Sequence, residues 1–312
     1  MQSWLKQGRI FNPIDDIDWA KTHSALPTPF VLKDGTIRVF YTSRDFEQKS
    51  MVSYFDLHPN DITKPFNITN KAVVELGGLG TFDDRGHTSS CIVEKNDSYY
   101  YYLNGYNIGT PARYRISIGL AMSDDLENFT RYSEGPIMDR SIHDPCGVAT
   151  PFIVKINDLY HMWYTSFRKW EWINSDAEPF YCIRHAVSED AIKWSPDGKE
   201  CIELIEGEGG IVRPSVIIRN GVFHMWYSYR KNTGYRERLE ASYRIGYSKS
   251  LDGVTWERLD HLIDLSISAA GWDERMVAYP FVFECKNEIL MLYNGNGFGQ
   301  SGIGLAKLVT SL

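Results

Sequence analysis

Acidic residues occur in three short polar segments of the chain, each just ahead of an apolar run. The segments read FDDRGHTSS, HDPCGVATP and WDERMVAYP, and they contain Asp83, Asp84, Asp144, Asp273 and Glu274. Carboxyl groups can donate or accept protons in catalysis, or they can cap the turn before a strand. We take Asp84, Asp144 and Glu274 as candidate catalytic residues, and the capping alternative stays open for the repeated aspartates.

Four arginines accompany these acids, although the net charge of the chain is -7. They are Arg44, Arg168, Arg213 and Arg230. The planar guanidinium fork suits phosphate and carboxylate groups. The sequence therefore predicts an anionic substrate or co-substrate, which could be phosphate, a phosphorylated sugar, a sugar acid or a sugar nucleotide.

Aromatic and further polar groups complete the candidate binding set. Trp170 and Trp172 lie in the polar loop SFRKWEWINSDAEPFY, where an indole could stack on a sugar ring or could form part of a lid. A lone histidine such as His87 is more often structural. The residues predicted to bind substrate are Arg44, Arg85, His87, Asn104, Arg168, Trp170, Arg213, Arg230, Tyr279 and Asn294.

A five-fold repeat supplies the elements that would position these groups. PFIVKINDLYHMWYTS from Pro151 and PSVIIRNGVFHMWYSY from Pro214 each read as a strand, a turn and a second strand. Similar segments begin at Pro29, Ser90 and Pro280, so the unit recurs about every 62 residues. Third and fourth strands follow, as in RIGYSKSLDGVTWERL. Four antiparallel strands at this period are typical of a propeller blade.

The predicted fold is therefore all-β, a five-bladed β-propeller with four antiparallel strands per blade. We expect one domain, residues 1–312, with the ring closed by the N-terminal segment. The blades would span roughly residues 20–75, 76–138, 139–204, 205–264 and 265–312. The MWY segments of the second strands are interpreted as core.

Strand direction places the candidate groups on one face of such a ring. The start of each first strand, the end of each second strand and the start of each third strand should converge on the axial pocket. Thr28, Ser89, Thr150, Arg213 and Tyr279 would lie at the starts of the first strands. Arg213 breaks the repeat there and is therefore a stronger functional candidate. The ends of the second strands would carry Arg44, Asn104, Arg168, Arg230 and Asn294.

Composition excludes several classes of function. The chain has no basic stripe, so a nucleic-acid partner is not expected. It has no apolar run of membrane-spanning length, and the N-terminus lacks the apolar region of a signal peptide. The five cysteines are scattered, which favours reduced thiols in a cytoplasmic protein. No metal-ligand spacing and no nucleotide-binding glycine motif occur, so no cofactor is predicted.

The repeated unit resembles a known superfamily. The pattern P-x-h-h-x-x-x-G-x-h-x-M-W-Y-S followed by I-G-x-A-x-S-x-D is similar to the five-bladed propellers of glycoside hydrolase families 43, 32, 68 and 130. The resemblance covers roughly residues 20–308, and GWDERMVAYPFVFECKNEILMLYNGNGFGQSGIGLAKL is similar to their final blade. Family 43 places its catalytic acids directly before the first-strand Pro or one residue earlier. Those places here hold no acid, so the resemblance implies no standard family 43 triad.

The resemblance implies a carbohydrate-active enzyme that acts on a glycosidic bond in the axial pocket. Hydrolysis needs a protonated carboxyl group and a second carboxylate, for which Asp84, Asp144 and Glu274 are the candidates. A phosphorylase of the family 130 type needs one protein acid, because phosphate itself attacks. The alternative is a non-catalytic or transferase-type sugar-binding propeller in surface-glycan metabolism. A protein-interaction scaffold is the third reading, which the charged channel face disfavours.

Overall fold

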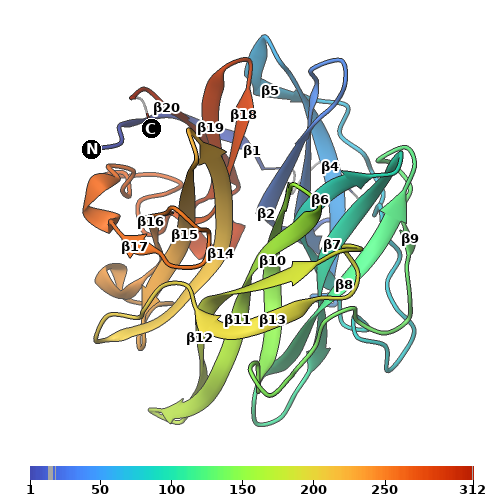
Figure 1. The fold of residues 1–312 in the computed structure, drawn as a ribbon, viewed down its shortest axis with the longest axis vertical. Helices are drawn as coiled ribbons and strands as arrows, with labels where there is room; N and C mark the ends of the chain where they lie inside the picture. The colour runs from blue at the N-terminus through green and yellow to red at the C-terminus, as the bar shows by residue number, and fades with distance from the viewer. Residues whose placement is uncertain (13–16, 18, 311) are drawn as a thin grey trace.

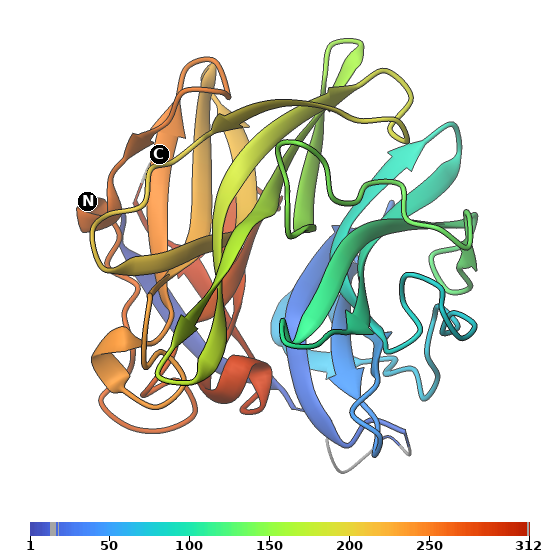
Figure 2. The ribbon, with the colours of Figure 1, turned by 90° about the horizontal axis from the view of Figure 1, so that it is seen from below.

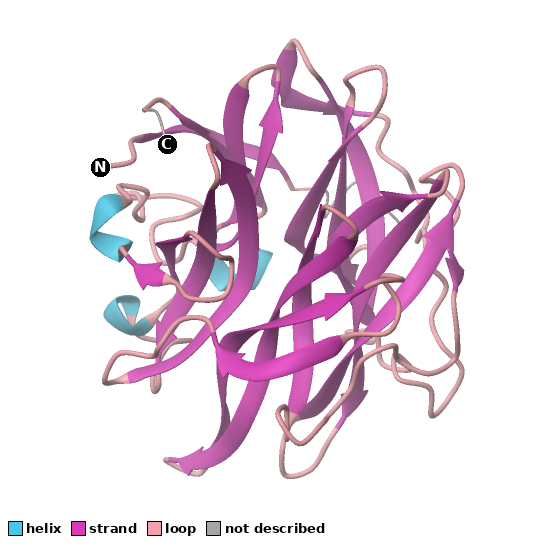
Figure 3. Cartoon of the chain, viewed as in Figure 1, coloured by secondary structure: helices cyan, strands magenta, loops and turns pink. Residues whose placement is uncertain are grey.

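The computed structural model, which describes residues 1–12, 17, 19–310 and 312, is built almost entirely of β-strands (Figures 1 and 3). Its helical elements are α1 (Asn296–Gly299) and two short 3-10 turns, η1 (Leu239–Ala241) and η2 (Asp260–Leu262). The all-β prediction is confirmed.

Three of the sheets have four antiparallel strands. The first contains β2 (Thr22–Val31), β3 (Ile37–Arg44), β4 (Ser50–His58) and β5 (Asp61–Phe66). The second contains β6 (His87–Lys95), β7 (Ser98–Ile108), β8 (Tyr114–Ser123) and β9 (Thr130–Arg131). The third contains β18 (Ala278–Cys285), β19 (Glu288–Asn294), β20 (Ile303–Leu308) and β1 (Trp4–Phe11).

The fourth sheet has eight strands and consists of two four-stranded halves. One half holds β10 (Gly147–Ile156), β11 (Leu159–Ile173), β12 (Asp176–Ser188) and β13 (Ser195–Glu200). The other holds β14 (Glu208–Arg219), β15 (Val222–Lys231), β16 (Arg244–Ser250) and β17 (Glu257–Arg258). A single parallel pair, Tyr181 with Gly210, joins the halves. Each half therefore repeats the hairpin order of the four-stranded sheets.

Both ends of the chain meet in one sheet. β1 pairs with β20 from Trp4 opposite Leu308 to Phe11 opposite Ile303. The two termini accordingly lie on the same side of the molecule in two perpendicular views (Figures 1 and 2). This pairing ties the first described strand to the last.

Tight turns join the first and second strand of each repeat. Three of these turns have two consecutive residues of positive φ: Asn96 (52°) with Asp97 (60°), Asn220 (52°) with Gly221 (75°), and Lys286 (49°) with Asn287 (65°). Two consecutive residues of positive φ are typical of the type I′ turn, whose twist matches that of the flanking strands. Asn, Asp and Gly adopt positive φ more readily than other residues. The strand–turn–strand units predicted from the sequence are therefore present.

The first strands of the five repeats contact one another in a closed cycle. β2 contacts β6, β6 contacts β10, β10 contacts β14, β14 contacts β18, and β18 contacts β2. Each of these strands carries a register shift near its start, for example between Ala149 and Phe152 and between Ala278 and Phe281. Such bulges change the direction in which the side chain of the extra residue points.

A polar side chain on each second strand holds the bulge of the following repeat. Backbone N–H groups of the first strands donate to these side chains, as in Leu26 to Asn294 Oδ1 (2.8 Å) and Tyr279 to Ser228 Oγ (2.7 Å). Thr42, Asn104 and Thr165 accept in the same way from Ser89, Thr150 and Arg213. Buried N–H groups at the bulges are thereby satisfied.

Arg213 fills the space between the first strands. Its side chain is buried, and the guanidinium group donates to the carbonyl oxygens of Ser90 (2.9 Å) and Pro27 (3.0 Å) and to Thr28 Oγ1 (3.0 Å). Burial lowers the pKa of Arg213 to about 10, so the group stays charged at neutral pH. The residue that breaks the repeat thus cross-links β14 to β2 and β6.

The core lies between the sheets. Trp163 and Trp226, from the two MWY segments, have no exposed surface, and their indole N–H groups donate to Gly253 O (2.7 Å) and Gln2 Oε1 (3.0 Å). Their interpretation as core is confirmed. All five cysteines are free thiols. Among the described residues, no helix has the length and apolar character needed to cross a membrane.

Candidate functional site

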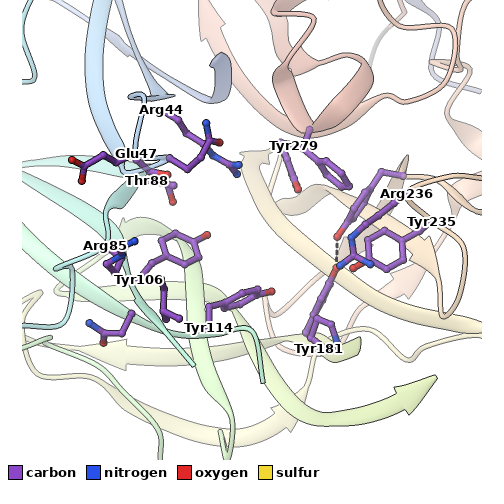
Figure 4. Close-up of a pocket in the computed structure, with 17 residues that line it drawn as sticks. Arg44, Glu47, Arg85, Thr88, Tyr106, Tyr114, Tyr181, Tyr235, Arg236 and Tyr279 are labelled. Atoms are coloured by element: carbon purple, nitrogen blue, oxygen red, sulfur yellow. Dashed lines mark hydrogen bonds between the residues drawn. The ribbon is translucent and has the colours of Figure 1, made fainter. Parts of the chain in front are cut away.

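A cavity of about 420 Å³ is lined by residues from several sheets (Figure 4). Its walls come from the starts of first strands (Thr88, Tyr279), the ends of second strands (Arg44, Tyr106) and the starts of third strands (Tyr114, Tyr181), together with long connections. We call this cavity the tyrosine pocket. Larger hollows, of about 730 and 670 Å³, are lined mainly by outer strands and their turns.

Six tyrosines dominate the lining of the tyrosine pocket, as Figure 4 shows for five of them. They are Tyr106, Tyr114, Tyr181, Tyr235, Tyr243 and Tyr279. Their rings pack edge to face, for example Tyr106 against Tyr114 at 5.7 Å. Burial raises the pKa of Tyr106, Tyr114 and Tyr279. These phenols are therefore protonated at neutral pH and can donate hydrogen bonds to a ligand.

Two of the lining arginines form no ion pair with a described carboxylate. Arg44 ends β3 and Arg85 precedes β6, and the charge of Arg85 contributes to lowering the pKa of Glu47. Both side chains lie on the same wall in Figure 4, beside Thr88. Unpaired guanidinium groups next to a cavity favour binding of an anion.

Arg230 lies behind the opposite wall. Its Nε donates to the Tyr181 hydroxyl oxygen at 2.6 Å, and that hydroxyl is hydrogen-bonded to the hydroxyl of Tyr243. The Arg230 guanidinium carbon is 3.9 Å from the ring centroid of Tyr235. Arg230 thus holds three pocket tyrosines in place. It binds Tyr181 by a hydrogen bond, Tyr243 indirectly through the Tyr181 hydroxyl, and Tyr235 by a cation–π contact.

Glu178 lies behind the same wall. The carboxylate accepts hydrogen bonds from Tyr235 (2.8 Å) and Arg236 (2.5 Å), and its side chain is 7% exposed. Burial alone would raise the pKa of Glu178, but the hydrogen bonds from Arg236 and Tyr235 outweigh it, and the pKa is lowered. Arg236, which lines the pocket, is therefore paired, unlike Arg44 and Arg85.

One described carboxylate lines the tyrosine pocket. Glu47, in the turn between β3 and β4, is exposed and pairs with Lys49 at 2.7 Å. The hydrogen bond from Lys49 lowers the pKa of Glu47. Glu47 is therefore ionised at neutral pH and poorly suited to donate a proton.

The three acids predicted to be catalytic do not meet in this pocket. Asp84 accepts hydrogen bonds from Gly80 N and from Asn107 Nδ2 (2.7 Å), and Asn107 belongs to the lining. Asp144 is fully buried and accepts from Tyr164 and Ser141. Glu274 caps a turn by accepting from Gly271 N. Asp84 is the one of the three that is hydrogen-bonded to a lining residue.

The predicted binding residues divide into lining and supporting groups. Arg44, Arg85 and Tyr279 line the tyrosine pocket. Arg230 supports it from behind. Arg213 is bonded to the inner strands, as described above, and His87 is buried 3.4 Å from Asp83.

Asn104 and Asn294 belong to the bulge-holding positions and not to the register of Arg44 and Arg230. When the second strands are aligned on Tyr41, Leu103, Tyr164, Tyr227 and Tyr293, each asparagine directly follows the aligned residue, and Arg44 and Arg230 stand two residues further on. The sequence contained the signal for this assignment. Thr42, Thr165 and Ser228 also directly follow the aligned residue, so the two asparagines share their position and not that of the arginines.

Arg168 and Trp170 lie farther along β11. Arg168 is exposed and pairs with Glu200 at 3.1 Å. Trp170 packs edge to face on Tyr114 at 5.1 Å and lines a neighbouring cavity. Neither lines the tyrosine pocket, and Trp170 contacts its wall through Tyr114.

Most of the pocket tyrosines and Glu178 were not among the residues predicted from the sequence. Tyr181 lies on β12, because the segment expected as a polar loop forms the extended β11–β12 hairpin, and Tyr235 and Tyr243 lie between β15 and β16. Their aromatic density in a chain of 19 tyrosines was the available signal. The pairing of Tyr235 with Glu178 could not be read from positions so far apart.

No protein-family model matches the chain. The chain is 31% identical over 307 residues to Uncharacterized protein Rv1502 of Mycobacterium tuberculosis (strain ATCC 25618 / H37Rv). The match covers 98% of this chain and 99% of Rv1502. The chain belongs to the Rv1502 family.

Solved structures give the fold of this family. A thermostable family-43 glycoside hydrolase superposes with a TM-score of 0.69 over 94% of this chain and 91% of its own, at 15% identity. A structure from the GH130 family of mannoside phosphorylases and β-1,2-mannoside hydrolases has a TM-score of 0.72 over 98% and 93%, at 16% identity. At such identities the likeness concerns the fold, and it confirms the expected resemblance at that level.

Proposed function

We propose that this member of the Rv1502 family is a carbohydrate-active enzyme that acts on a glycosidic bond in the tyrosine pocket. The substrate or co-substrate carries an anionic group that Arg44 and Arg85 bind. The observation that carries this proposal is the lining itself, in which three arginines and six tyrosines stand with a single described carboxylate. Phenol and guanidinium groups suit a polyhydroxylated, negatively charged ligand.

The proposed architecture is one domain, a five-bladed propeller, with the pocket at one end of its axis. The closed cycle of contacts among β2, β6, β10, β14 and β18 supports five blades. The pairing of β1 with β20 supports ring closure by the N-terminal strand. The Arg213 side chain would then block the axial channel beneath the pocket.

Phosphorolysis is the reaction that this lining favours. A phosphate oxygen attacks the anomeric carbon, the bond to the departing sugar breaks, and the departing oxygen takes a proton from one protein acid. Hydrolysis by the usual route would need a second carboxyl group. The unpaired Arg44 and Arg85 would bind and orient the phosphate.

Asp84 is the proposed proton donor. Among the three acids expected from the sequence, it alone is hydrogen-bonded to a residue of the lining, Asn107. Asp84→Asn should abolish turnover and leave anion binding within about twofold, because the substitution conserves volume and leaves the arginines in place.

Binding without turnover is the second candidate function. The single carboxylate in the described lining favours it, since Glu47 is exposed and paired with Lys49. The free state of all five cysteines supports the cytoplasm as the compartment, because thiols persist in reducing surroundings.

The activity test compares aryl glycosides with and without phosphate. The proposal predicts release of the aryl group that depends on phosphate, with a glycosyl phosphate as the second product. Arg85→Gln should lower the rate, and Arg219→Gln, at an exposed ion pair with Glu284, is the matched control. Binding of anionic sugars with no turnover of any glycoside would favour the second candidate.

A further inference from the structure

A second cavity lies beside the tyrosine pocket. Its volume is about 370 Å³, and its walls come from the loop between β7 and β8 and from the long hairpin of β11 and β12. Tyr114 lines both cavities. We call the second cavity the tryptophan cavity, after Trp170 and Trp172 in its lining.

The two indoles are presented by the extended tip of the hairpin. Trp170 pairs with Pro179 and Trp172 with Ala177 across the two strands. Trp172 is 67% exposed, and Trp170 rests edge to face on Tyr114. When the apolar face or the ring of a ligand covers a large exposed aromatic side chain beside a cavity, apolar surface is removed from water and binding is favoured. Trp172 therefore has the position of a stacking platform.

Two arginines in the same lining form no ion pair with a described carboxylate. Arg115 and Arg140 are exposed, and the carboxylate that shares the lining, Glu171, is paired with Lys169. The contrast is with Arg113 nearby, which pairs with Asp176 at 2.8 Å. In a chain of net charge -7, unpaired arginines at both cavities indicate that the anionic character of the ligand continues from one cavity into the next.

We propose that the tryptophan cavity binds a second acidic sugar unit of an oligosaccharide whose first unit occupies the tyrosine pocket. Its ring stacks on Trp172 and its acidic group contacts Arg115 and Arg140. This inference rests on the proposed function and sharpens it, because it makes the substrate an acidic oligosaccharide and not a single sugar.

The experiment measures affinity against ligand length. Oligogalacturonides of one to four units serve as the carboxylated probes in titration calorimetry with the full chain. The wild-type protein should bind the longer oligomers at least about tenfold more tightly than the single unit, as expected when a central aromatic contact is added. Trp172→Ala and Arg140→Gln should each remove most of this gain and leave the affinity for the single unit unchanged.

Two control variants match these changes elsewhere on the surface. Phe66→Ala removes another exposed ring, 43% exposed on β5, and Arg219→Gln removes another exposed arginine. Both should bind every oligomer as the wild type does. Binding of the single unit with no gain on lengthening, or a full gain in Trp172→Ala, would overturn the inference alone. Failure of every length to bind would also overturn the inference, whereas the proposed function would still hold if inorganic phosphate binds at Arg44 and Arg85.

Discussion

The Tyr235 hydroxyl donates a hydrogen bond to the buried carboxylate of Glu178 at 2.8 Å. Arg236 donates to the other oxygen of the same carboxylate. The negative charge of Glu178 is thereby neutralised behind the pocket wall, and the surface that faces a ligand consists of phenol and guanidinium groups. This pair explains how a chain with excess acidic residues can present a pocket suited to anions.

Glu178→Gln should destabilise the fold by about 2 kcal/mol, because it leaves Arg236 without its buried partner while the amide can still accept from Tyr235. Urea denaturation followed by circular dichroism gives the value. Glu284→Gln, at the exposed pair with Arg219, should change stability by less than about 0.5 kcal/mol. Equal stability of the two variants would show that Glu178 has no supporting role.

Arg213→Ala should cost at least about 3 kcal/mol, because carbonyl oxygens of Pro27 and Ser90 would lose their buried donor. Arg213→Lys should recover part of the loss, since ammonium can reach fewer acceptors than the guanidinium fork. Thermal unfolding measures both. If Arg213→Ala unfolds at the wild-type temperature, the cross-link between the inner strands contributes nothing.

Asn294→Ala should cost about 2 kcal/mol, because the side chain accepts from Leu26 N and donates to the carbonyl oxygens of Ser24 and Gly302. Ser228→Ala, which loses one acceptor for Tyr279 N, should cost about 1 kcal/mol. Chemical denaturation distinguishes the two. A larger loss for Ser228→Ala would contradict the ranking by number of hydrogen bonds.

Stability should fall as the pH drops from 7 to 5, in part through His185. Burial, followed by the nearby His161, lowers the pKa of His185 from 6.5 to about 4. The unfolded chain takes up this proton first, so the contribution is present above pH 6.5 and is lost progressively as the pH falls toward 4. The expected loss from this group between pH 7 and pH 5 is about 2 kcal/mol. His185→Gln should flatten the pH profile by that amount, and an unchanged slope would contradict it.

The repeated hairpins could be predicted because local chemistry determines them. Asn220 with Gly221 specifies its turn, and the alternation around Trp163 and Trp226 specifies buried strands. The role of Asp144 could not be predicted in the same way, because its buried partner Tyr164 belongs to another part of the repeat.

The pocket was the less predictable part of the molecule. Arg44, Arg85 and Tyr279 were found because strand direction fixes which ends of the strands converge. Tyr235 was not, because it lies in the connection between β15 and β16, whose conformation depends on tertiary contacts. Glu178 was not, because its segment was expected as a loop but forms the β11–β12 hairpin. Arg213 was expected to bind substrate because it breaks the repeat, but it does not line the tyrosine pocket, and its guanidinium group bonds to backbone carbonyls of strands that are distant in the sequence.

Titration of inorganic phosphate into the protein by calorimetry tests most directly whether the tyrosine pocket binds anions. The wild type should bind phosphate, and the double variant Arg44→Gln, Arg85→Gln should bind it at least about tenfold more weakly, since each lost charge-assisted hydrogen bond weakens the complex. Arg219→Gln should bind as the wild type does. Equal phosphate affinity in all three proteins, or no binding to the wild type, would contradict an anion site in this pocket.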